Sequence, residues 1–374
     1  MLLYRILASL DAFYLAEKSN AKSRSQATNI KPQGSGVGFG VGPRTRSIQA
    51  NPLTTTKPSK RDLQLLSFFR GIAWILSTST TEEGLLDLMR LSLLDVAIEE
   101  LLRNDSITDL SERMELSAAF LTCLESIGKN PNLAEFYTQE RDEMTSSDGL
   151  ERIIRGDGQR ITKHRNQGGS VTGTTKSPPL LDLMDNLGRQ AEAFSKTLGN
   201  AHGPLNNGDR NVINSVNLSR SILAVRQLLH TTANQCGMTN SRALATPASS
   251  EEVYRGICSQ LAYDELPSSF SNGNFHYARQ AMTVNSVNQR RTITLAKELS
   301  TMATSLPPGI FVRNIANRPD CIKALIAGPE GTPYFGGLFE FDIFATPNYP
   351  AEPPRVHFLT TSQSRVRFNP NLYA

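Results

Sequence analysis

Apolar residues recur at intervals of three and four through much of the first two thirds of the chain, and this spacing is typical of helices with one buried face. Residues 1–20 are predicted to form one amphipathic helix. Residues 61–140 repeat the pattern in several short runs separated by polar turns. Short helices joined in this way favour a helical-repeat array of the armadillo or HEAT type. The shared face of the first helix is formed by Leu3, Leu7, Leu10 and Tyr14.

Two polar stretches interrupt these helices. Residues 21–60 are rich in Ser, Thr, Gly, Pro and basic residues, so we expect a flexible segment that completes a first region over 1–60. Its glycine-rich part, 34–42, has no preceding strand and no Gly-Lys-Ser/Thr, so we interpret it as a flexible segment rather than a nucleotide-binding loop. Residues 141–176 are also polar and are predicted to form a disordered linker.

Helical spacing resumes in residues 177–265. Two long runs, 179–200 and 211–235, are joined by a polar loop and predict an antiparallel helical hairpin. A shorter helix is expected over 250–262. The aromatic cluster Phe275-His276-Tyr277 follows, and its histidine is expected to be packed or exposed rather than catalytic, because it has no acidic or thiol partner nearby in the sequence.

The pattern changes to strand spacing in residues 285–374. A helix is predicted to run to Thr304 and to end at Pro307-Pro308-Gly309. Strand-like runs follow, separated by Gly- and Pro-rich turns. A helix followed by a four-stranded antiparallel meander is an α+β arrangement. The four predicted strands are Ile310–Ile315, Ile322–Ala327, Leu338–Ala345 and Arg355–Leu359.

Composition narrows the function classes. A net charge of only +4 over 374 residues gives little electrostatic support for nucleic-acid binding. No apolar run has transmembrane length, and Arg5 and Asp11 interrupt the apolar N-terminus, so we expect neither a membrane span nor a signal peptide. The four cysteines lie far apart without metal-ligand spacing, which predicts no metal site and a reducing, cytoplasmic compartment. We expect no cofactor. The cysteines are Cys123, Cys236, Cys258 and Cys321.

The order of turn blocks in residues 285–374 resembles the first half of a ubiquitin-conjugating (E2) domain. Helix, Pro-Pro, two strands, a glycine-rich turn, an alternating strand, a proline-rich turn and Pro-Asn occur in the E2 order. The resemblance covers about the last quarter of the chain and implies the E2 fold up to its active-site loop. The blocks are Gly328-Pro329, Gly331-Thr332-Pro333-Tyr334, Gly336-Gly337, Tyr349-Pro350, Pro353-Pro354 and Pro370-Asn371.

Upstream segments resemble the C-terminal region of the giant BIR-containing ubiquitin ligases of the BRUCE or Apollon type. The matching segments are Gly36–Gly42, Leu101–Asp109 and Phe275-His276-Tyr277. This resemblance implies a helical region before an E2 domain, and a hybrid E2/E3 activity that ubiquitinates apoptotic proteins. It implies ubiquitin, an E1 enzyme and protein substrates as partners.

E2 chemistry is acyl transfer through a cysteine thioester, which a substrate lysine then attacks. The resemblance assigns Asn371 a role at the oxyanion or in holding the active-site loop. Asn369 replaces the histidine that usually precedes Pro-Asn. Ala351 replaces the large apolar residue that many E2 enzymes use to dock a RING-type ligase, which favours an enzyme acting as its own ligase.

The E2 nucleophile is missing from these 374 residues. Cys321 opens the second predicted strand, away from the active-site loop, and the other cysteines precede the domain. We therefore expect no ubiquitin thioester on this chain. We also expect one apolar face of the meander to be exposed, because E2 domains cover it with helices that follow the cysteine.

Three readings stay open. The chain is a fragment of a ubiquitin-transfer enzyme, a catalytically dead E2-like module that binds ubiquitin or partner proteins, or a helical scaffold with a vestigial E2 portion. A coding continuation after Ala374 with Gly and Cys would favour the first reading. A stop codon there would favour the others.

Overall fold

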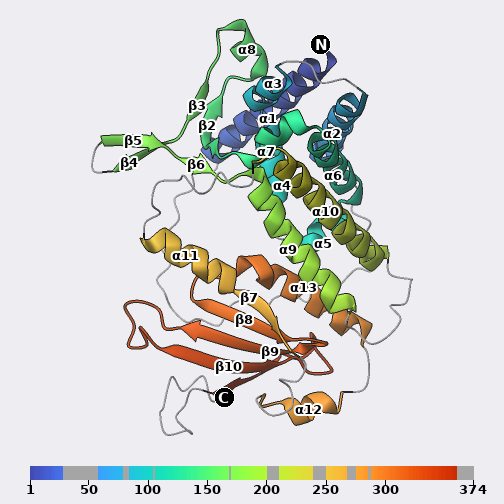
Figure 1. Cartoon of the computed structure of the whole chain (residues 1–374), viewed down its shortest axis with the longest axis vertical. Coiled ribbons are helices and arrows are strands. Elements are labelled where there is room, and N and C mark those ends of the chain that lie inside the picture. Colours follow the sequence, from blue (N-terminus) through green and yellow to red (C-terminus); the bar gives the residue numbers. More distant parts are fainter. Residues whose placement is uncertain are drawn as a thin grey trace. The chain divides into compact units, whose positions relative to one another are not determined.

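The computed structural model describes the chain in nine stretches that fall into two compact units. Unit 1 comprises Met1–Asp95 with Asp142–Lys176, and unit 2 comprises Val96–Arg141 with Ser177–Ala374. Figure 1 labels their helices and strands. No helix in the described stretches is both long and apolar enough to cross a membrane. These stretches are 1–27, 58–78, 84–103, 106–167, 170–199, 210–238, 250–267, 275–284 and 288–359.

Unit 1 is built on its first helix, α1, which packs against α2 and α8. The face predicted from the sequence is buried, since Leu7 and Leu10 have no exposed surface. Asp11 on this helix accepts backbone N–H bonds from Leu93 at 2.7 Å and Leu150 at 2.8 Å. One carboxylate thus holds α1 to the first turns of two further helices, where free N–H groups need acceptors. The helices are α1 (Leu2–Ala27), α2 (Lys60–Thr78), α3 (Leu85–Leu91), α4 (Leu94–Leu102, which continues into unit 2) and α8 (Leu150–Arg155).

Residues 141–176, for which we expected a disordered linker, form short strands and a helix instead. Glu143 N–H donates to Thr175, Thr175 N–H to Lys163 and Lys163 N–H to Glu143, each at 2.7 Å. The polar composition had suggested that these backbone N–H and C=O groups face water, but they bond to one another instead. The spacing of residues in the sequence does not reveal such long-range bonds. The strands are β1 (Arg141–Asp142), β2 (Met144–Ser147), β3 (Arg160–Thr162), β4 (His164–Gln167), β5 (Ser170–Thr174) and β6 (Lys176–Ser177).

The helical part of unit 2 centres on α9 and α10, which run antiparallel. Arg226 of α10 donates to Asp185 and Glu192 of α9 at 2.7 and 2.8 Å, and His230 lies 2.7 Å from Asp185. α10 also packs on α6. The unit is mixed helix and sheet, and the armadillo or HEAT assignment stays a prediction. The helices are α5 (Ile107–Glu112), α6 (Met114–Gly128), η1 (Pro131–Leu133), α7 (Ala134–Thr138), α9 (Leu180–Gly199), α10 (Arg210–Gln235), α11 (Ser250–Leu261), α12 (Ala278–Met282) and α13 (Gln289–Ser305).

The sheet of unit 2 has five strands in the order β11-β10-β9-β8-β7. The four predicted antiparallel strands are present, but the expected four-stranded meander omitted β7, which pairs parallel with β8 and sets Tyr263 opposite Val312. Figure 1 shows β7 between α11 and β8. The strands are β7 (Tyr263–Leu266), β8 (Ile310–Ile315), β9 (Arg318–Ala327), β10 (Leu338–Phe344) and β11 (Arg355–Phe358).

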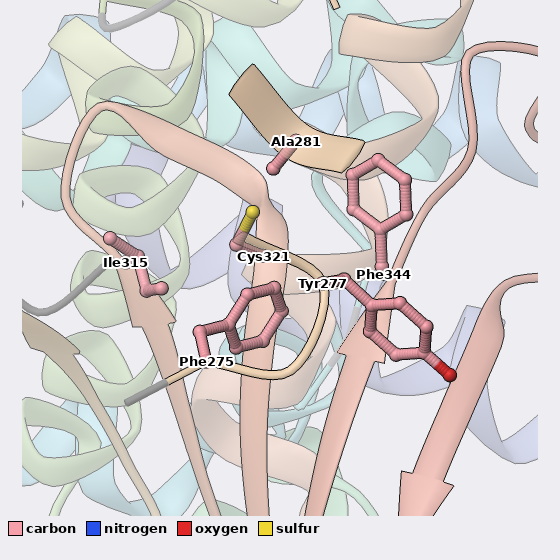
Figure 2. Packing of buried hydrophobic residues seen from close by; sticks show 6 residues of the cluster. All are labelled: Phe275, Tyr277, Ala281, Ile315, Cys321 and Phe344. Atoms are coloured by element: carbon pink, nitrogen blue, oxygen red, sulfur yellow. The ribbon is translucent and has the colours of Figure 1, made fainter. Parts of the chain in front are cut away.

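The two faces of this sheet bury different partners. On the first face, Leu299 of α13 packs on Val312, Ile322 and Ala324. On the second face, residues 275–284 bring a group of apolar side chains onto the ends of three strands, as Figure 2 shows. Both faces are therefore covered in part by segments that precede the strands. The second cluster consists of Phe275, Tyr277, Ala281, Ile315, Cys321 and Phe344.

The first face continues beyond α13 as a row of aromatic side chains on β10 and β11. Phe341 stacks on Phe358 with ring centroids 4.8 Å apart, and Phe339 lies 6.0 Å from the same ring. Phe339 and Phe341 are half-buried, and Val356 in the same face is 56% exposed. In the apolar surface that we expected to be exposed, the rings of Phe339, Phe341 and Phe358 therefore cover one another in part. Val356 at its margin stays exposed.

Candidate active-site region of the C-terminal sheet

The turn between β9 and β10 holds the first glycine-rich block in a closed loop. Gly328 N–H donates to Gly337 at 2.9 Å, and Gly337 N–H donates to Tyr334 at 3.0 Å. A Cβ atom at Gly328 would lie 1.8 Å from the Tyr334 carbonyl oxygen, so only glycine fits there. The backbone contact explains why the sequence places a glycine at this position.

The proline-rich block after β10 is tied to α13 through one phenol. The Tyr349 hydroxyl donates to Glu298 on α13 at 2.5 Å, and Tyr349 N–H donates to Thr346 at 3.0 Å. The Tyr349–Pro350 peptide bond is cis. Burial and then the Glu298 carboxylate raise the pKa of Tyr349 to about 12, which keeps the phenol a donor at neutral pH. Helix and loop are therefore fixed in position relative to each other.

A buried network of ion pairs joins the loop after β10 to helix α13 and strand β9. Arg291 of α13 lies 2.8 Å from Asp320 and donates to the Ala345 carbonyl at 2.6 Å. Arg318 also contacts Asp320 at 2.8 Å. Burial disfavours the charged carboxylate, but the bonds and charges of Arg318 and Arg291 outweigh burial, so the pKa of Asp320 lies below its usual value.

A second charged group lies under residues 275–284. Lys323 of β9 contacts Glu340 at 2.6 Å and Asp342 at 2.8 Å, both on β10. The fully buried Asp342 also accepts the backbone N–H of His276 at 2.6 Å. The His276 ring stacks on His357 with centroids 3.6 Å apart. Residues 275–284 are thus held to the sheet by polar bonds as well as by apolar packing.

His276 has the acidic neighbour that its sequence surroundings did not show, but the contact is made by its backbone. His276 is exposed, and its ring stacks on His357. Burial and then the adjacent His276 lower the pKa of His357, with Asp342 acting in the opposite direction. This cluster is a packing feature of the sheet face.

Two of the four cysteines lack the surroundings of a nucleophile. Cys123 and Cys321 have no exposed surface, and burial raises the pKa of each thiol to about 12. Cys258 is buried, and Cys236 contacts the Pro131 carbonyl at 3.6 Å. Because the thiolate is the reactive form, the two high pKa values oppose acyl transfer. Cys321 is the fourth residue of β9 rather than the opening residue of the predicted strand.

The structure describes Ala351 but not the Asn369-Pro370-Asn371 segment that was assigned to the active-site loop. Asn371, with Asn369 and Pro370, lies outside the described residues. Ala351 is exposed in the turn after β10, and its N–H donates to Asn348 at 2.8 Å. Within the described stretches, no three His, Cys, Asp or Glu side chains are grouped so that they could hold a metal ion.

Sequence reasoning missed the residues that position these loops. Glu298 and Asp320 were not singled out, and helical spacing predicted Arg291 on the outward face of its helix, where the structure instead buries it at 8% exposure. All three contact the loop segment or its supporting strand. The sequence held little signal for them, because Asp320 precedes the predicted strand Ile322–Ala327 and Arg291 was predicted to face outward. Their partners are about 30 to 50 residues away, so spacing could not identify them.

A helix, antiparallel strands, tethered turns and a proline-rich loop thus follow one another in the order noted from the sequence. Residues 294–374 match the ubiquitin-conjugating enzyme family. The resemblance of this C-terminal segment to ubiquitin-conjugating enzymes, noted from the turn blocks, is therefore confirmed.

Relatives extend the similarity upstream of the matched segment. The chain is 28% identical to "Probable ubiquitin-conjugating enzyme protein 17" of Caenorhabditis elegans, over 96% of the chain and 50% of that protein. It is 30% identical to human "Dual E2 ubiquitin-conjugating enzyme/E3 ubiquitin-protein ligase BIRC6", over 77% of the chain and 6% of that protein. "Ubiquitin-conjugating enzyme E2 Z" of Danio rerio is 41% identical over 23% of the chain and 26% of its own length. The chain thus spans half or less of these relatives.

Proposed function

We propose that this chain is part of a cytoplasmic protein that transfers ubiquitin from an E1 enzyme to substrate lysines, and that the 374 residues themselves form no thioester. The observation that carries the proposal is the tethering of the Tyr349-Pro350 block to α13 through Glu298. This contact fixes the proline-rich loop between β10 and β11 against α13. The relatives with ubiquitin-conjugating names support the same class.

In the proposed reaction, a lysine amine attacks the thioester carbonyl carbon. A C–N bond forms, the C–S bond breaks, the thiolate leaves and the amine loses a proton. Asn371 is proposed to donate to the oxyanion or to hold the loop. In this proposal the nucleophilic sulfur comes from a residue other than the four cysteines present, because Cys123 and Cys321 are fully buried with raised pKa values.

The buried thiols favour a second candidate, a module that binds ubiquitin or partner proteins without transferring it. Both candidates predict that these 374 residues form no ubiquitin thioester. Incubation with E1, ATP and ubiquitin, followed by a non-reducing gel, should give no reducible adduct on this chain. A thiol-sensitive adduct that disappears when one of the four cysteines is replaced by alanine would contradict the proposal.

A positive control shows whether the absence of an adduct reflects this chain or an inactive E1 enzyme. In the same reaction, a ubiquitin-conjugating enzyme with its own active-site cysteine should form the reducible adduct, which shows that E1 is active. Variant Cys321→Ala should behave as the parent chain does in this assay, because a fully buried thiol does not reach the E1 thioester.

A further inference from the structure

Helix α11 presents its apolar face to solvent. Val253, Tyr254, Ile257 and Leu261 share one face of this helix, and they are 49%, 52%, 51% and 50% exposed. An amphipathic helix at a protein surface normally turns such a face toward the core. Four half-exposed apolar side chains in a row are instead typical of a docking surface.

The helix is attached to the sheet by its other side and by its C-terminal end. Cys258 is the buried residue among the described side chains of α11, and Ala262 directly after the helix is buried too. Arg313 of β8 donates to the Leu261 carbonyl at 2.9 Å. Figure 1 shows α11 at the margin of the sheet, beside β7. The apolar stripe is therefore held in place by contacts that leave it open.

Charge limits the kind of partner. Residues 250–266 contain Glu251, Glu252, Asp264 and Glu265 against the single cation Arg255, a formal charge of −3 within a chain of net charge +4. Gly256 lies at the margin of the stripe, and a Cβ atom there would meet nothing within 4 Å. A partner surface can thus approach the backbone closely at this point. The complementary surface is a small apolar patch bordered by basic side chains.

We propose that α11 is a non-covalent docking helix for ubiquitin. This inference rests on the proposed function, which brings ubiquitin to this chain as the transferred protein. A stripe of four side chains on a single helix suits a small folded partner and a weak, rapidly exchanging contact. Docking beside the sheet would raise the local concentration of ubiquitin next to the conjugating domain.

The test is a titration of ¹⁵N-labelled ubiquitin with the full chain, without E1 or ATP, followed by NMR. Ubiquitin signals should shift at one surface patch. Ile257→Asp places a charge in the stripe and should weaken binding at least about tenfold. The matched control is Leu63→Asp, which changes a similarly exposed leucine on α2 of unit 1 and should leave binding unchanged.

Charge variants test the acidic border separately. Arg255→Ala removes the cation and should tighten binding, whereas Glu251→Lys should weaken it, and both effects should shrink at high salt. Far-UV circular dichroism checks that each variant is folded. Absence of binding, or equal binding by the parent chain and Ile257→Asp, overturns the proposal. Self-association of the chain that Ile257→Asp abolishes would assign the stripe to a second copy and also overturn it.

Failure here and failure of the proposed function are distinguishable. The titration contains no activating enzyme, so it reports docking alone. Loss of docking with no change in the E1 experiment would reject the helix as a ubiquitin site and leave the proposed function as it stands.

Discussion

At Asp320, helix α13, strand β9 and the start of the loop after β10 are joined through one residue. Arg291 from α13 and Arg318 from β9 both contact it, and the Asp320 carbonyl accepts the Ala345 N–H at 2.9 Å. Its side chain is only 5% exposed, so each arginine depends on it for charge compensation. Removing one member of such a buried network leaves the others uncompensated.

We therefore expect Asp320→Asn to lower the free energy of unfolding of unit 2 by about 3 kcal/mol. Urea denaturation followed by circular dichroism measures the change. The control is Glu251→Gln, which breaks an exposed pair with Arg255 on α11 and should have little effect. Because the pKa of Asp320 is lowered, its contribution is present above the unfolded value and is lost as the pH falls below 3.8. Equal stability of the variant and the parent chain would contradict this account.

Asp11 has the opposite pH behaviour. Burial raises its pKa to about 6, against the lowering effect of the N–H bonds from Leu93 and Leu150. Between pH 6 and its unfolded value of 3.8, the folded chain binds the proton more strongly than the unfolded chain does. Acidification therefore favours the folded state of unit 1 through this group.

Relative to Asp11→Asn, the parent chain should gain about 2 kcal/mol of stability in unit 1 between pH 7 and pH 4. Comparing the two proteins cancels the effects of the other carboxylates. Hydrogen exchange of the α1 amides at each pH measures the difference. A parent-to-variant difference that stays constant across this range would show that Asp11 does not titrate there.

At the scale of elements, residues 275–284 cover part of the second face of the sheet. Phe275 is 5% exposed and packs with Tyr277 against strand residues. We expect Phe275→Ala to cost about 3 kcal/mol of sheet stability, because it leaves a cavity over Cys321. Faster hydrogen exchange in β9 and easier alkylation of Cys321 would report the opening.

Val356→Ala is the matched control for this element. Val356 lies on β11 of the same sheet but is 56% exposed, so its truncation should change stability little. If both variants unfold at the same urea concentration as the parent chain, residues 275–284 do not stabilise the sheet in the way described.

Sequence reasoning found the elements that are marked by neighbouring residues and missed those that depend on residues far away in the chain. The four antiparallel strands were predictable because turn residues mark their ends, and alternating residues such as Phe341 and Asp342 face opposite sides. β7 was missed because Tyr-Asp-Glu-Leu is short and half polar, and its partner strand lies about 50 residues further on. The strands in 141–176 were missed because bonds such as Lys163 to Glu143 are not encoded in hydrophobic spacing.

For the candidate site, the sequence indicated the class of reaction but not the contacts that hold the loop in place. The missing nucleophile stays a prediction from the positions of the four cysteines in the sequence, and the burial of Cys321 supports it. The tether from Tyr349 to Glu298 needed the structure, since the two residues are 51 positions apart. Asn371 remains a prediction from resemblance.

At the scale of the whole molecule, the chain contains two compact units whose segments alternate along the sequence. Each unit has its own carboxylate clamp, Asp11 in the first and Asp320 in the second. We expect hydrogen exchange to rise in α1 and α8 for Asp11→Asn, and in α13 and β9 for Asp320→Asn, with little transfer of the effect. Increased exchange in both units from either variant would show that they unfold as one.

The added strand β7 has a consequence for the solubility of the conjugating domain. By pairing with β8, it occupies a backbone edge that would otherwise be free to recruit a strand from another molecule. Its own outer edge is blunted, since Asp264 accepts the outward Glu265 N–H at 2.8 Å. An expression boundary drawn at α13 would uncover the longer, more apolar edge of β8 and favour aggregation, so the domain is best delimited before Tyr263 rather than at the start of its first helix.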